Sequence, residues 1–390
     1  MKAIVNACVM TPDGFVDGQS VLFESGKIIK VCDDANRPAS VPVDSDLDGM
    51  MLVPGFIDIQ VNGGGGVLFN DSPTVDAIAA IGEAHRQFGT TGFFPTLISD
   101  DLQVMERAIK AVDDAIEAGV PGVLGIHLEG PFLNPEKSGV HDLSKFMRIG
   151  ADDVALMASL QRGKTIVTLA PEMTTPAVIG ALHHHGVIVS AGHTQASYEE
   201  TCGALEAGLR GFTHLFNAMR PMTSRQPGII AAALEDKRAW CGVIADGYHV
   251  HPAMLRLARR AKAEEQIFLV TDAMPSVGAA HKDFSLGATD IAVADGKCMT
   301  GDGTLAGSDL DMISAVRNTM KFLGVDLSQA VRMASHVPAR FARLHQRLGQ
   351  IRPGLQADFI ALSMHHEIIN VWVKGEMMFD QTHNCKAAIA

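Results

Sequence analysis

The chain has 390 residues, which is long enough to bury a large core and about right for one barrel with a small accessory module. Its 47% hydrophobic content, 19% charged residues and 38 glycines are typical of a compact enzyme with many tight turns. The formal net charge of −12 excludes a general attraction to nucleic acid, so an anionic substrate would have to be held by local donors.

We expect a cytoplasmic protein without a membrane partner. The first twenty residues lack the apolar core of a signal peptide, and no apolar run reaches about 18 residues. The cysteines are scattered and form no C-x-x-C pair, which favours reduced thiols over a disulfide frame or a zinc ribbon. They are Cys8, Cys32, Cys202, Cys241, Cys298 and Cys385.

Both ends of the chain are rich in strand-like runs, whereas the middle is not. Residues 2–56 contain KAIVNACVMT, SVLFESGKIIKVCDD and MMLVPGF, and residues 354–379 are GLQADFIALSMHHEIINVWVKGEMMF; we place the module itself at residues 1–53 and 355–390. Runs of this kind, bounded by turn residues, predict short strands. We therefore expect the two termini to pair into one small β-module.

Between the termini, in residues 54–354, apolar strand-like runs alternate with helical patterns. The runs are LVPGFIDIQVN, GFFPTLIS, GVLGIHLEG, TIVTLAPE, GVIVSAGHT, GFTHLFNAM, CGVIADGYHV and IFLVTDAM. Eight βα repeats favour a (β/α)₈ barrel, an α/β fold, and a doubly wound sheet is the alternative. The stretch from Ser276 to Ser308 is too long and glycine-rich for a simple loop, so we expect a hairpin-bearing insertion over the barrel mouth. One helix in DLDMISAVRNTMKFLG and one in DLSQAVRMASHVPARFARL should follow.

Ionisable residues close or follow five of the apolar runs, where a barrel of this kind has its active site. They are Glu129, His193, His214, His249 and Asp272. One such group is often a hydrogen-bonded core residue or a cap. Five of them on different runs are hard to explain as packing, so they predict a catalytic site.

Three of these residues have the chemistry of a metal site. Glu129, His193 and His214 offer one carboxylate and two imidazoles, which together with a water describe a catalytic divalent-metal centre, with Zn²⁺ as the default. Fe²⁺, Co²⁺ or Mn²⁺ would also suit these ligands. Asp272 has no cation partner in its own run, so its natural role is to take a proton from the water and deliver it to the leaving group.

Six motifs carry a resemblance to a known family. HLEGPFL, SAGHTQA, THLFNAM, ADGYHVHP, VTDAM and GDGTLAGS, in this order, resemble the amidohydrolase superfamily and in particular its N-acetylglucosamine-6-phosphate deacetylases. The resemblance runs from VPGFIDIQVNG to GQIRPGLQADFIAL. It implies a metal-bearing barrel of the amidohydrolase type with a small β-sandwich built from both termini. It also implies hydrolysis of N-acetyl-D-glucosamine 6-phosphate to D-glucosamine 6-phosphate and acetate, in amino-sugar catabolism.

The resemblance also implies roles for single residues. Glu129, His193 and His214 match the metal ligands, and Asp272 matches the catalytic acid/base. His141, in KSGVHDL, matches a catalytic histidine that contacts the substrate carbonyl. The residues that match contacts of the sugar phosphate are Asn217, Ala218, Arg225 and His249. In the family part of this set comes from the neighbouring subunit, so a homodimer is expected. On the sequence alone, an ordinary loop residue is the alternative for His141 and an equally good interpretation for Arg225.

The first barrel strand departs from many amidohydrolases, which carry His-x-His where this chain has Gln60 and Asn62. Neutral amides bind a divalent cation weakly, so these are lost second-metal positions and we expect one metal per chain. The four glycines that follow, residues 63–66, could form a phosphate cradle. A close turn at the barrel mouth is the better interpretation.

Other functions remain open at this level. A sibling enzyme that acts on N-acetylgalactosamine 6-phosphate or on another N-acyl substrate would carry the same motifs. A non-catalytic assembly protein derived from this fold would have lost the metal ligands and the acid/base, which are present here. An aldolase or isomerase would need a lysine or a carboxylate base at a strand end, and no strand-end lysine is present.

Overall fold

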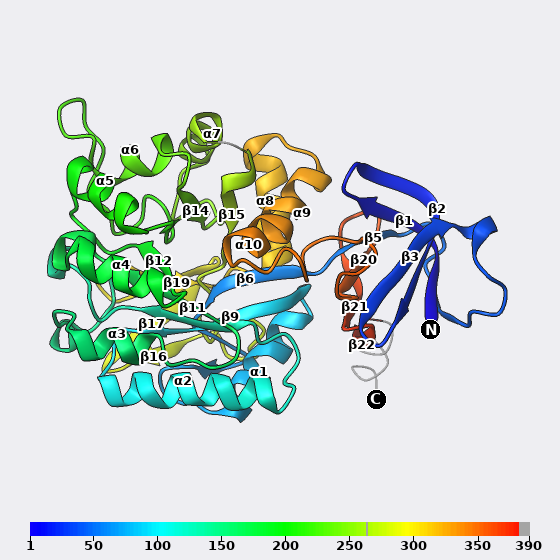
Figure 1. Cartoon of the computed structure of the whole chain (residues 1–390), viewed down its shortest axis with the longest axis horizontal. Coiled ribbons are helices and arrows are strands. Elements are labelled where there is room, and N and C mark those ends of the chain that lie inside the picture. The colour runs from blue at the N-terminus through cyan, green and yellow to red at the C-terminus, as the bar shows by residue number, and fades with distance from the viewer. Residues whose placement is uncertain (263, 382–390) are drawn as a thin grey trace.

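The computed structural model of the chain describes residues 1–262 and 264–381. Figure 1 shows a helix-covered barrel joined to a smaller module in which the blue N-terminal strands lie beside the red C-terminal ones. Cys385 and the end of the expected module, residues 382–390, lie outside the described residues.

The barrel is an eight-stranded parallel sheet whose neighbouring strands follow chain order. Its strands are β6 (Phe56–Val61), β9 (Thr90–Ile98), β10 (Gly125–Glu129), β11 (Lys164–Leu169), β12 (Ile188–Ala191), β13 (Gly211–Phe212), β14 (Trp240–Val243) and β15 (Ile267–Leu269). Each expected run therefore overlaps one barrel strand. The segment after β15 closes the barrel on β6, because the backbone N–H of Asp272 donates to the carbonyl of Gln60 at 3.0 Å and that of Asn62 donates to Ala273 at 2.9 Å. Chain-order pairing excludes the doubly wound alternative, in which the strand order reverses.

Helices cover the outside of the barrel, so every residue of β6 is buried. They are α1 (Val75–Arg86), α2 (Leu102–Glu117), α3 (Ala151–Met157), α4 (Pro176–His184), α5 (Tyr198–Ala207), α6 (Gly228–Glu235), α7 (Pro252–Ala261), α8 (Met312–Leu323), α9 (Leu327–Ala334) and α10 (His336–Phe341). Helix α2 shows the sequence logic, since Met105, Ala108, Ile109 and Val112 form its buried stripe at helical spacing. None of the described helices is both long and apolar enough to cross a membrane.

The prediction of a single helix in DLSQAVRMASHVPARFARL was wrong, because this stretch forms two helices, α9 and α10, which are separated at Ser335. Pro338 explains the break. Its ring would collide with the carbonyl of Ala334 in a continuous helix, and it has no N–H to donate. Ser335 takes non-helical angles, with φ −131° and ψ −74°, and its hydroxyl donates to the carbonyl of Val331 at 2.7 Å.

The terminal module is a second sheet, with the order β22-β21-β20-β5-β1-β2-β3 and β4 paired to β1. Its strands are β1 (Lys2–Thr11), β2 (Gly14–Glu24), β3 (Lys27–Asp33), β4 (Val43–Asp46), β5 (Met51–Pro54), β20 (Phe359–Leu362), β21 (Ile368–Val373) and β22 (Glu376–Asp380). The antiparallel pair β5–β20 joins the two ends of the chain, as expected. The boundaries at 53/54 and 354/355 stay a prediction. At the junction Gly55 leads from β5 into β6, where a Cβ atom would lie 2.0 Å from the Thr91 hydroxyl.

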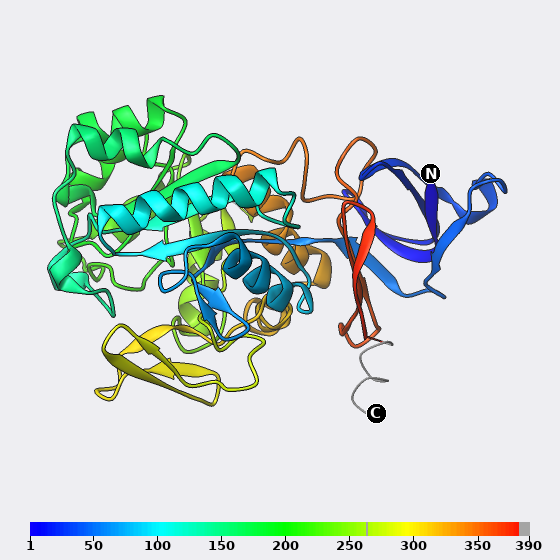
Figure 2. The same ribbon diagram turned by 90° about the horizontal axis from the view of Figure 1, so that it is seen from below.

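The expected insertion is a four-stranded antiparallel sheet. Its strands are β16 (Phe284–Leu286), β17 (Thr289–Ala294), β18 (Lys297–Met299) and β19 (Leu305–Ser308). Figure 2 shows it in yellow, set against the barrel and well away from the terminal module. Its small core joins Ile291, Cys298 and Ala306 to Met274, which follows the last barrel strand. The insertion thereby becomes part of the barrel mouth.

Candidate active site

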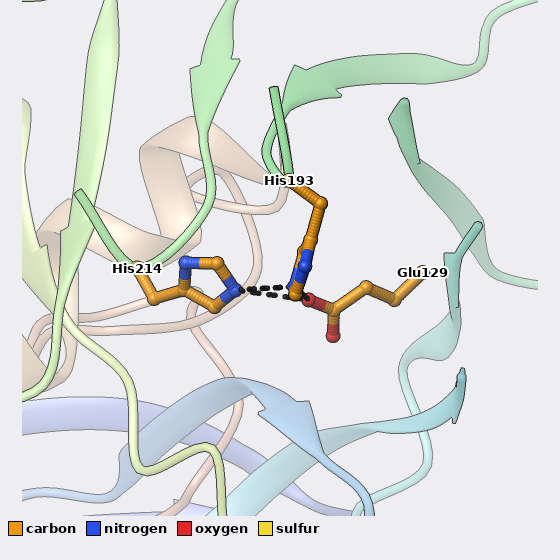
Figure 3. A group of neighbouring side chains, drawn as sticks. All are labelled: Glu129, His193 and His214. Carbon is orange, nitrogen blue, oxygen red and sulfur yellow. Dashed lines mark hydrogen bonds and ion pairs between the residues drawn. The ribbon is translucent and has the colours of Figure 1, made fainter. Parts of the chain in front are cut away.

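The predicted metal ligands lie at the carboxyl ends of three different strands. Glu129 is the last residue of β10, and His193 and His214 follow β12 and β13 by two residues each. Figure 3 shows the three side chains pointing toward one another from separate strands. They line a pocket of about 350 Å³, a size suited to a small substrate.

The ligand atoms of this triad converge closely. Glu129 Oε1 lies 3.1 Å from His193 Nε2 and 3.0 Å from His214 Nε2, and the two nitrogens are 3.1 Å apart. His193 Nδ1 donates to the carbonyl of Lys137 at 2.7 Å, so in the neutral ring Nε2 keeps its lone pair. Burial raises the pKa of Glu129, but the interactions with His193 and His214 outweigh it and hold that pKa well below its ordinary value. A buried carboxylate and two imidazole nitrogens around one point suit a divalent cation.

The backbone is strained where the strands end at the site. His193, His214 and Asp272 have φ angles of 49°, 34° and 54°, in the left-handed region that non-glycine residues rarely adopt. Ala218, on the same pocket wall, has a φ of 48°. Such conformations persist only when the surrounding structure enforces them, and they gather at functional sites.

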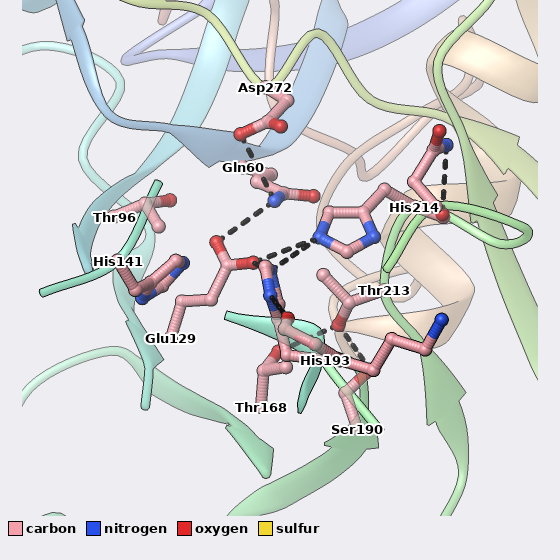
Figure 4. Close-up of polar contacts among 12 residues, drawn as sticks. Gln60, Thr96, Glu129, His141, Thr168, Ser190, His193, Thr213, His214 and Asp272 are labelled. Atoms are coloured by element: carbon pink, nitrogen blue, oxygen red, sulfur yellow. Dashed lines mark hydrogen bonds and ion pairs between the residues drawn. The ribbon is translucent and has the colours of Figure 1, made fainter. Parts of the chain in front are cut away.

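Asp272 lies beside the triad, held by the two amides of the first strand. Gln60 Nε2 and Asn62 Nδ2 donate to its Oδ1 at 3.1 Å and 2.7 Å. The same Gln60 nitrogen lies 3.0 Å from Glu129 Oε2, so it bridges the acid/base candidate to a metal ligand, as Figure 4 shows. Burial and then the charge of Glu129 raise the pKa of Asp272 to about 6. The sequence indicated only that these amides are poor ligands. Their role as donors came from the structure.

His141 is a buried residue of the pocket, which removes the alternative of an ordinary surface loop. The backbone N–H of Ser99 donates to its Nδ1 at 3.3 Å, and the Ser99 hydroxyl lies 2.8 Å from the same atom. The ring proton must therefore sit on Nε2. Burial and then the neighbouring His193 lower the pKa of His141 to about 3, so the ring is a neutral donor. Ser99 was not singled out from the sequence, although it ends the second strand-like run.

The structure brings together three of the four residues expected to contact the sugar phosphate. Asn217, Ala218 and His249 line the pocket beside the triad. Arg225 does not, because it lies exposed in the loop of residues 221–227. This side chain needs either a movement of the loop or a second copy of the chain to reach a bound ligand.

The glycine run forms a tight hairpin at the barrel mouth, as expected. Gly63 and Gly64 make β7, which pairs with β8 (Val67–Leu68). A Cβ on Gly64 would lie 2.8 Å from the buried ring of His85, and Gly65 and Gly66 have φ angles of 63° and 86°. Close packing and left-handed turns thus account for the run, and none of the four glycines lines the pocket described above.

Comparisons with known proteins agree with this geometry. Residues 51–378 match the model of the amidohydrolase family. The N-acetylgalactosamine-6-phosphate deacetylase of Shewanella sp. (strain ANA-3) is 44% identical over 329 residues, which cover 84% of this chain and 83% of that protein.

Solved structures extend the similarity over almost the whole chain. The N-acetylglucosamine-6-phosphate deacetylase of Pasteurella multocida superposes with a TM-score of 0.93 at 32% identity, covering 96% of this chain and 99% of its own. A mutant of the Mycobacterium smegmatis N-acetyl-D-glucosamine-6-phosphate deacetylase has been solved in complex with N-acetyl-D-glucosamine 6-phosphate. It superposes with a TM-score of 0.89 at 31% identity, covering 97% of this chain and 99% of its own. The chain therefore belongs to the amidohydrolase family of metal-dependent hydrolases.

Proposed function

We propose that this enzyme hydrolyses the N-acetyl group of N-acetyl-D-glucosamine 6-phosphate, giving D-glucosamine 6-phosphate and acetate. The observation that carries the proposal is the meeting of three groups in one buried pocket: the Glu129–His193–His214 triad, the amide-held Asp272 and the neutral donor His141. The similar Mycobacterium smegmatis protein, whose structure holds this sugar phosphate, supports the choice of substrate.

The residues of the pocket supply the proton transfers of an amide hydrolysis. Glu129, His193 and His214 would hold a divalent cation, which would supply Lewis acidity toward the acetyl carbonyl and the attacking water. Asp272 accepts a proton from that water as the oxygen adds to the acetyl carbon. Both amide hydrogen bonds fall on Oδ1, which leaves Oδ2 as the oxygen for proton exchange.

His141 and Asp272 complete the reaction. The Nε2–H of His141 donates to the carbonyl oxygen as negative charge develops there, an interaction worth about 3 kcal/mol in other enzymes. When the C–N bond breaks, Asp272 returns the proton to the leaving nitrogen. The water is thus divided between acetate and the free amine.

N-acetylgalactosamine 6-phosphate is the second candidate substrate. It is favoured by the 44%-identical Shewanella relative, which bears the name of that activity. The two sugars differ only in the configuration of the C4 hydroxyl, so both place the same acetamido group and phosphate in the pocket. A non-catalytic role is disfavoured, because the metal triad and the acid/base are all present.

A substrate panel tests the proposal. The metal-loaded enzyme is given both N-acetylhexosamine 6-phosphates and the two unphosphorylated sugars, and acetate release is measured. We expect the highest kcat/KM on N-acetylglucosamine 6-phosphate and the lowest on the sugars without phosphate. A higher value on the galactose epimer would transfer the proposal to that substrate, and no acetate release from any of the four would refute it.

We further propose one Zn²⁺ per chain and a cytoplasmic homodimer in which Arg225 completes the partner's phosphate site. The exposed position of Arg225, outside its own pocket, supports a shared site. Metal analysis of protein purified without added ions should give about one ion per chain. Light scattering should give twice the 41.5 kDa of the chain. Two tightly bound ions, or a monomer with full activity, would contradict these proposals.

A further inference from the structure

Glu172, which closes the apolar run TIVTLAPE, carries a carboxyl group to which the mechanism above assigns no role. It lies in the short helix η4 (Pro171–Met173), directly after β11. In the barrel β11 lies between β10 and β12, the strands that lead to Glu129 and His193. Glu172 itself does not line the pocket, so a role in the site must act through other residues.

The carboxyl group of Glu172 holds the loop that follows β12. Its Oε2 accepts from the hydroxyl of the buried Thr194 at 2.5 Å, and its Oε1 accepts the backbone N–H of Gln195 at 2.6 Å. These two residues come directly after His193. Because His193 has a left-handed φ of 49°, that conformation persists only while the neighbouring backbone is held.

The same carboxyl group also holds the loop that follows β10. Its Oε1 accepts from the side-chain amide nitrogen of Asn134 at 2.8 Å. The amide oxygen of Asn134 in turn accepts the backbone N–H of Glu136 at 2.9 Å, which caps the short helix η2 (Pro135–Lys137). The backbone N–H of Asn134 donates to the carbonyl of His193 at 3.0 Å. Glu172 therefore joins the loops on both sides of it.

These hydrogen bonds form a closed cycle around His193. Helix η2 ends at Lys137, whose carbonyl accepts from Nδ1 of the His193 ring at 2.7 Å. A carbonyl can only accept, so Nδ1 is the donor whatever the charge of the ring. A Cβ on Gly139 would lie 3.4 Å from the same ring, which shows how closely the chain after η2 packs against it. The backbone of His193 and its imidazole are thus held by two arms that meet at Glu172.

We propose that Glu172 is a positioning residue that holds His193 in the geometry of a metal ligand. It acts by accepting hydrogen bonds from Asn134, Thr194 and Gln195, so no particular charge on a histidine is needed. An imidazole that is already aimed by fixed contacts loses little freedom when an ion binds, and the ion is held more tightly. The inference rests on the triad as a metal site and not on the identity of the substrate.

Glu172→Ala tests the proposal, because it removes the acceptor of both arms. The holoenzyme loaded with Zn²⁺ is equilibrated with a competing chelator in the absence of substrate, and the Zn²⁺ dissociation constant is measured. We expect this constant to rise on the order of 10-fold to 100-fold, the usual cost of losing an outer partner of a metal ligand. An unchanged dissociation constant in Glu172→Ala would overturn the proposal.

The measurement separates this inference from the proposed function. If Glu172→Ala weakens Zn²⁺ binding while the wild type hydrolyses no N-acetylhexosamine phosphate, the proposed function fails and the positioning role stands. A wild type that binds no Zn²⁺ would overturn the positioning role together with the metal triad.

A conservative variant distinguishes hydrogen bonding from charge. Glu172→Gln keeps the length of the side chain and one oxygen, which can accept from Asn134 and Gln195. Its amide nitrogen can donate to the hydroxyl of Thr194. Glu172→Gln should therefore retain most of the affinity for Zn²⁺. A loss as large as that of Glu172→Ala would mean that the charge of Glu172 acts and not its hydrogen bonds, against the proposal.

Two more variants separate positioning from folding. Asn134→Ala breaks only the arm toward η2, so it should raise the Zn²⁺ dissociation constant less than Glu172→Ala does. The double variant should lose less affinity than the two single losses combined, because both act on His193. Fully additive losses would show two independent effects and contradict the proposal.

Glu200→Ala is the matched control. The Glu200 side chain accepts the backbone N–H and the hydroxyl of Ser197 at 2.8 Å and 2.9 Å, in a cap at the start of α5. Its removal costs contacts of the same kind to a backbone N–H and a hydroxyl. Thermal unfolding of the metal-free variants measures the cost to stability, and Glu200→Ala should bind Zn²⁺ like the wild type. An equal loss of affinity in Glu200→Ala and Glu172→Ala would reduce the role of Glu172 to general stability and overturn the proposal.

Discussion

The floor of the pocket and its rim are built in different ways. The floor, formed by Glu129, His193, His214 and Asp272, comes from four strand ends. The first three residues are buried and in direct contact, and Gln60 bridges Asp272 to Glu129 through hydrogen bonds. The rim is formed by the turn 246–249 and the insertion residues 304–307, and the proposed dimer adds the exposed loop 221–227 of a second copy. All three segments lie outside the barrel strands. If the proposed function holds, the barrel fixes the residues of the chemistry, whereas loops outside it recognise the substrate.

We therefore expect substitutions in the floor to have the largest effects on activity. Asp272→Asn should lower kcat on the order of 10³-fold, because an amide cannot accept the proton of the attacking water. The metal content should be unchanged, since Asp272 lies outside the triad. Acetate release and metal analysis on the same preparation check this. Unchanged kcat would remove Asp272 from the mechanism.

His141→Gln should lower kcat on the order of 10²-fold with little change in KM, because the lost donor acts on charge that develops only in the transition state. Steady-state kinetics on the substrate panel measures it. Ser99→Ala is the companion variant, as it removes only the hydroxyl at Nδ1 and keeps the backbone donor. A rise in KM alone after His141→Gln would move this residue from catalysis to binding.

The pH dependence follows from the raised pKa of Asp272. Burial and then the charge of Glu129 place this pKa at about 6, and the protonated acid cannot act as a base. The kcat should therefore be full above that pH and fall about tenfold per pH unit below it. The profile of Asp272→Asn should lack this limb. If kcat declines at the same low pH in both proteins, the decline must be due to another group.

Gln60→Leu should lower kcat roughly tenfold, because it removes the bridge between Asp272 and Glu129 while Asn62 still holds Oδ1. Gln19→Leu, in the terminal module, is the matched control for losing a buried amide that donates to an aspartate. Thermal unfolding of both variants measures the cost to stability. Equal losses of activity would mean that Gln60 matters only for folding.

The rim should give the smallest effect. Arg225→Gln should raise KM for the phosphorylated sugar about tenfold, leave kcat unchanged and have no effect on the sugar without phosphate. Arg352→Gln, another exposed arginine just before the C-terminal part of the terminal module, controls for the lost charge. The same KM in both variants would show that Arg225 contacts no substrate, and the rim would then consist of the chain's own turn and insertion alone.

Most of the fold could be predicted from the sequence. Buried parallel strands are nearly continuous apolar runs, so each barrel strand is visible between helical patterns. The break between α9 and α10 was missed because Pro338 lies inside an otherwise regular helical pattern. The collision of its ring with the carbonyl of Ala334 becomes evident only when the chain is placed on a helix.

The candidate site could also be predicted only in part. The pattern of apolar runs already shows which residues end the strands, and a parallel barrel must gather those ends at one face. Glu129, His193, His214 and Asp272 could therefore be selected without a structure. Their roles in catalysis stay predictions until the variants are measured.

The contacts that hold these residues in place could be found only in the folded chain. Gln60 and Asp272 are 212 residues apart, and their hydrogen bond exists because the first strand closes on the segment after the last. Glu172 reaches Asn134 across 38 residues and Thr194 across 22, because the barrel places the loops after neighbouring strands side by side. The exposure of Arg225 is likewise a property of the folded loop. A sequence pattern specifies residues and their spacing, whereas contacts across the barrel depend on closure and packing that no local pattern encodes.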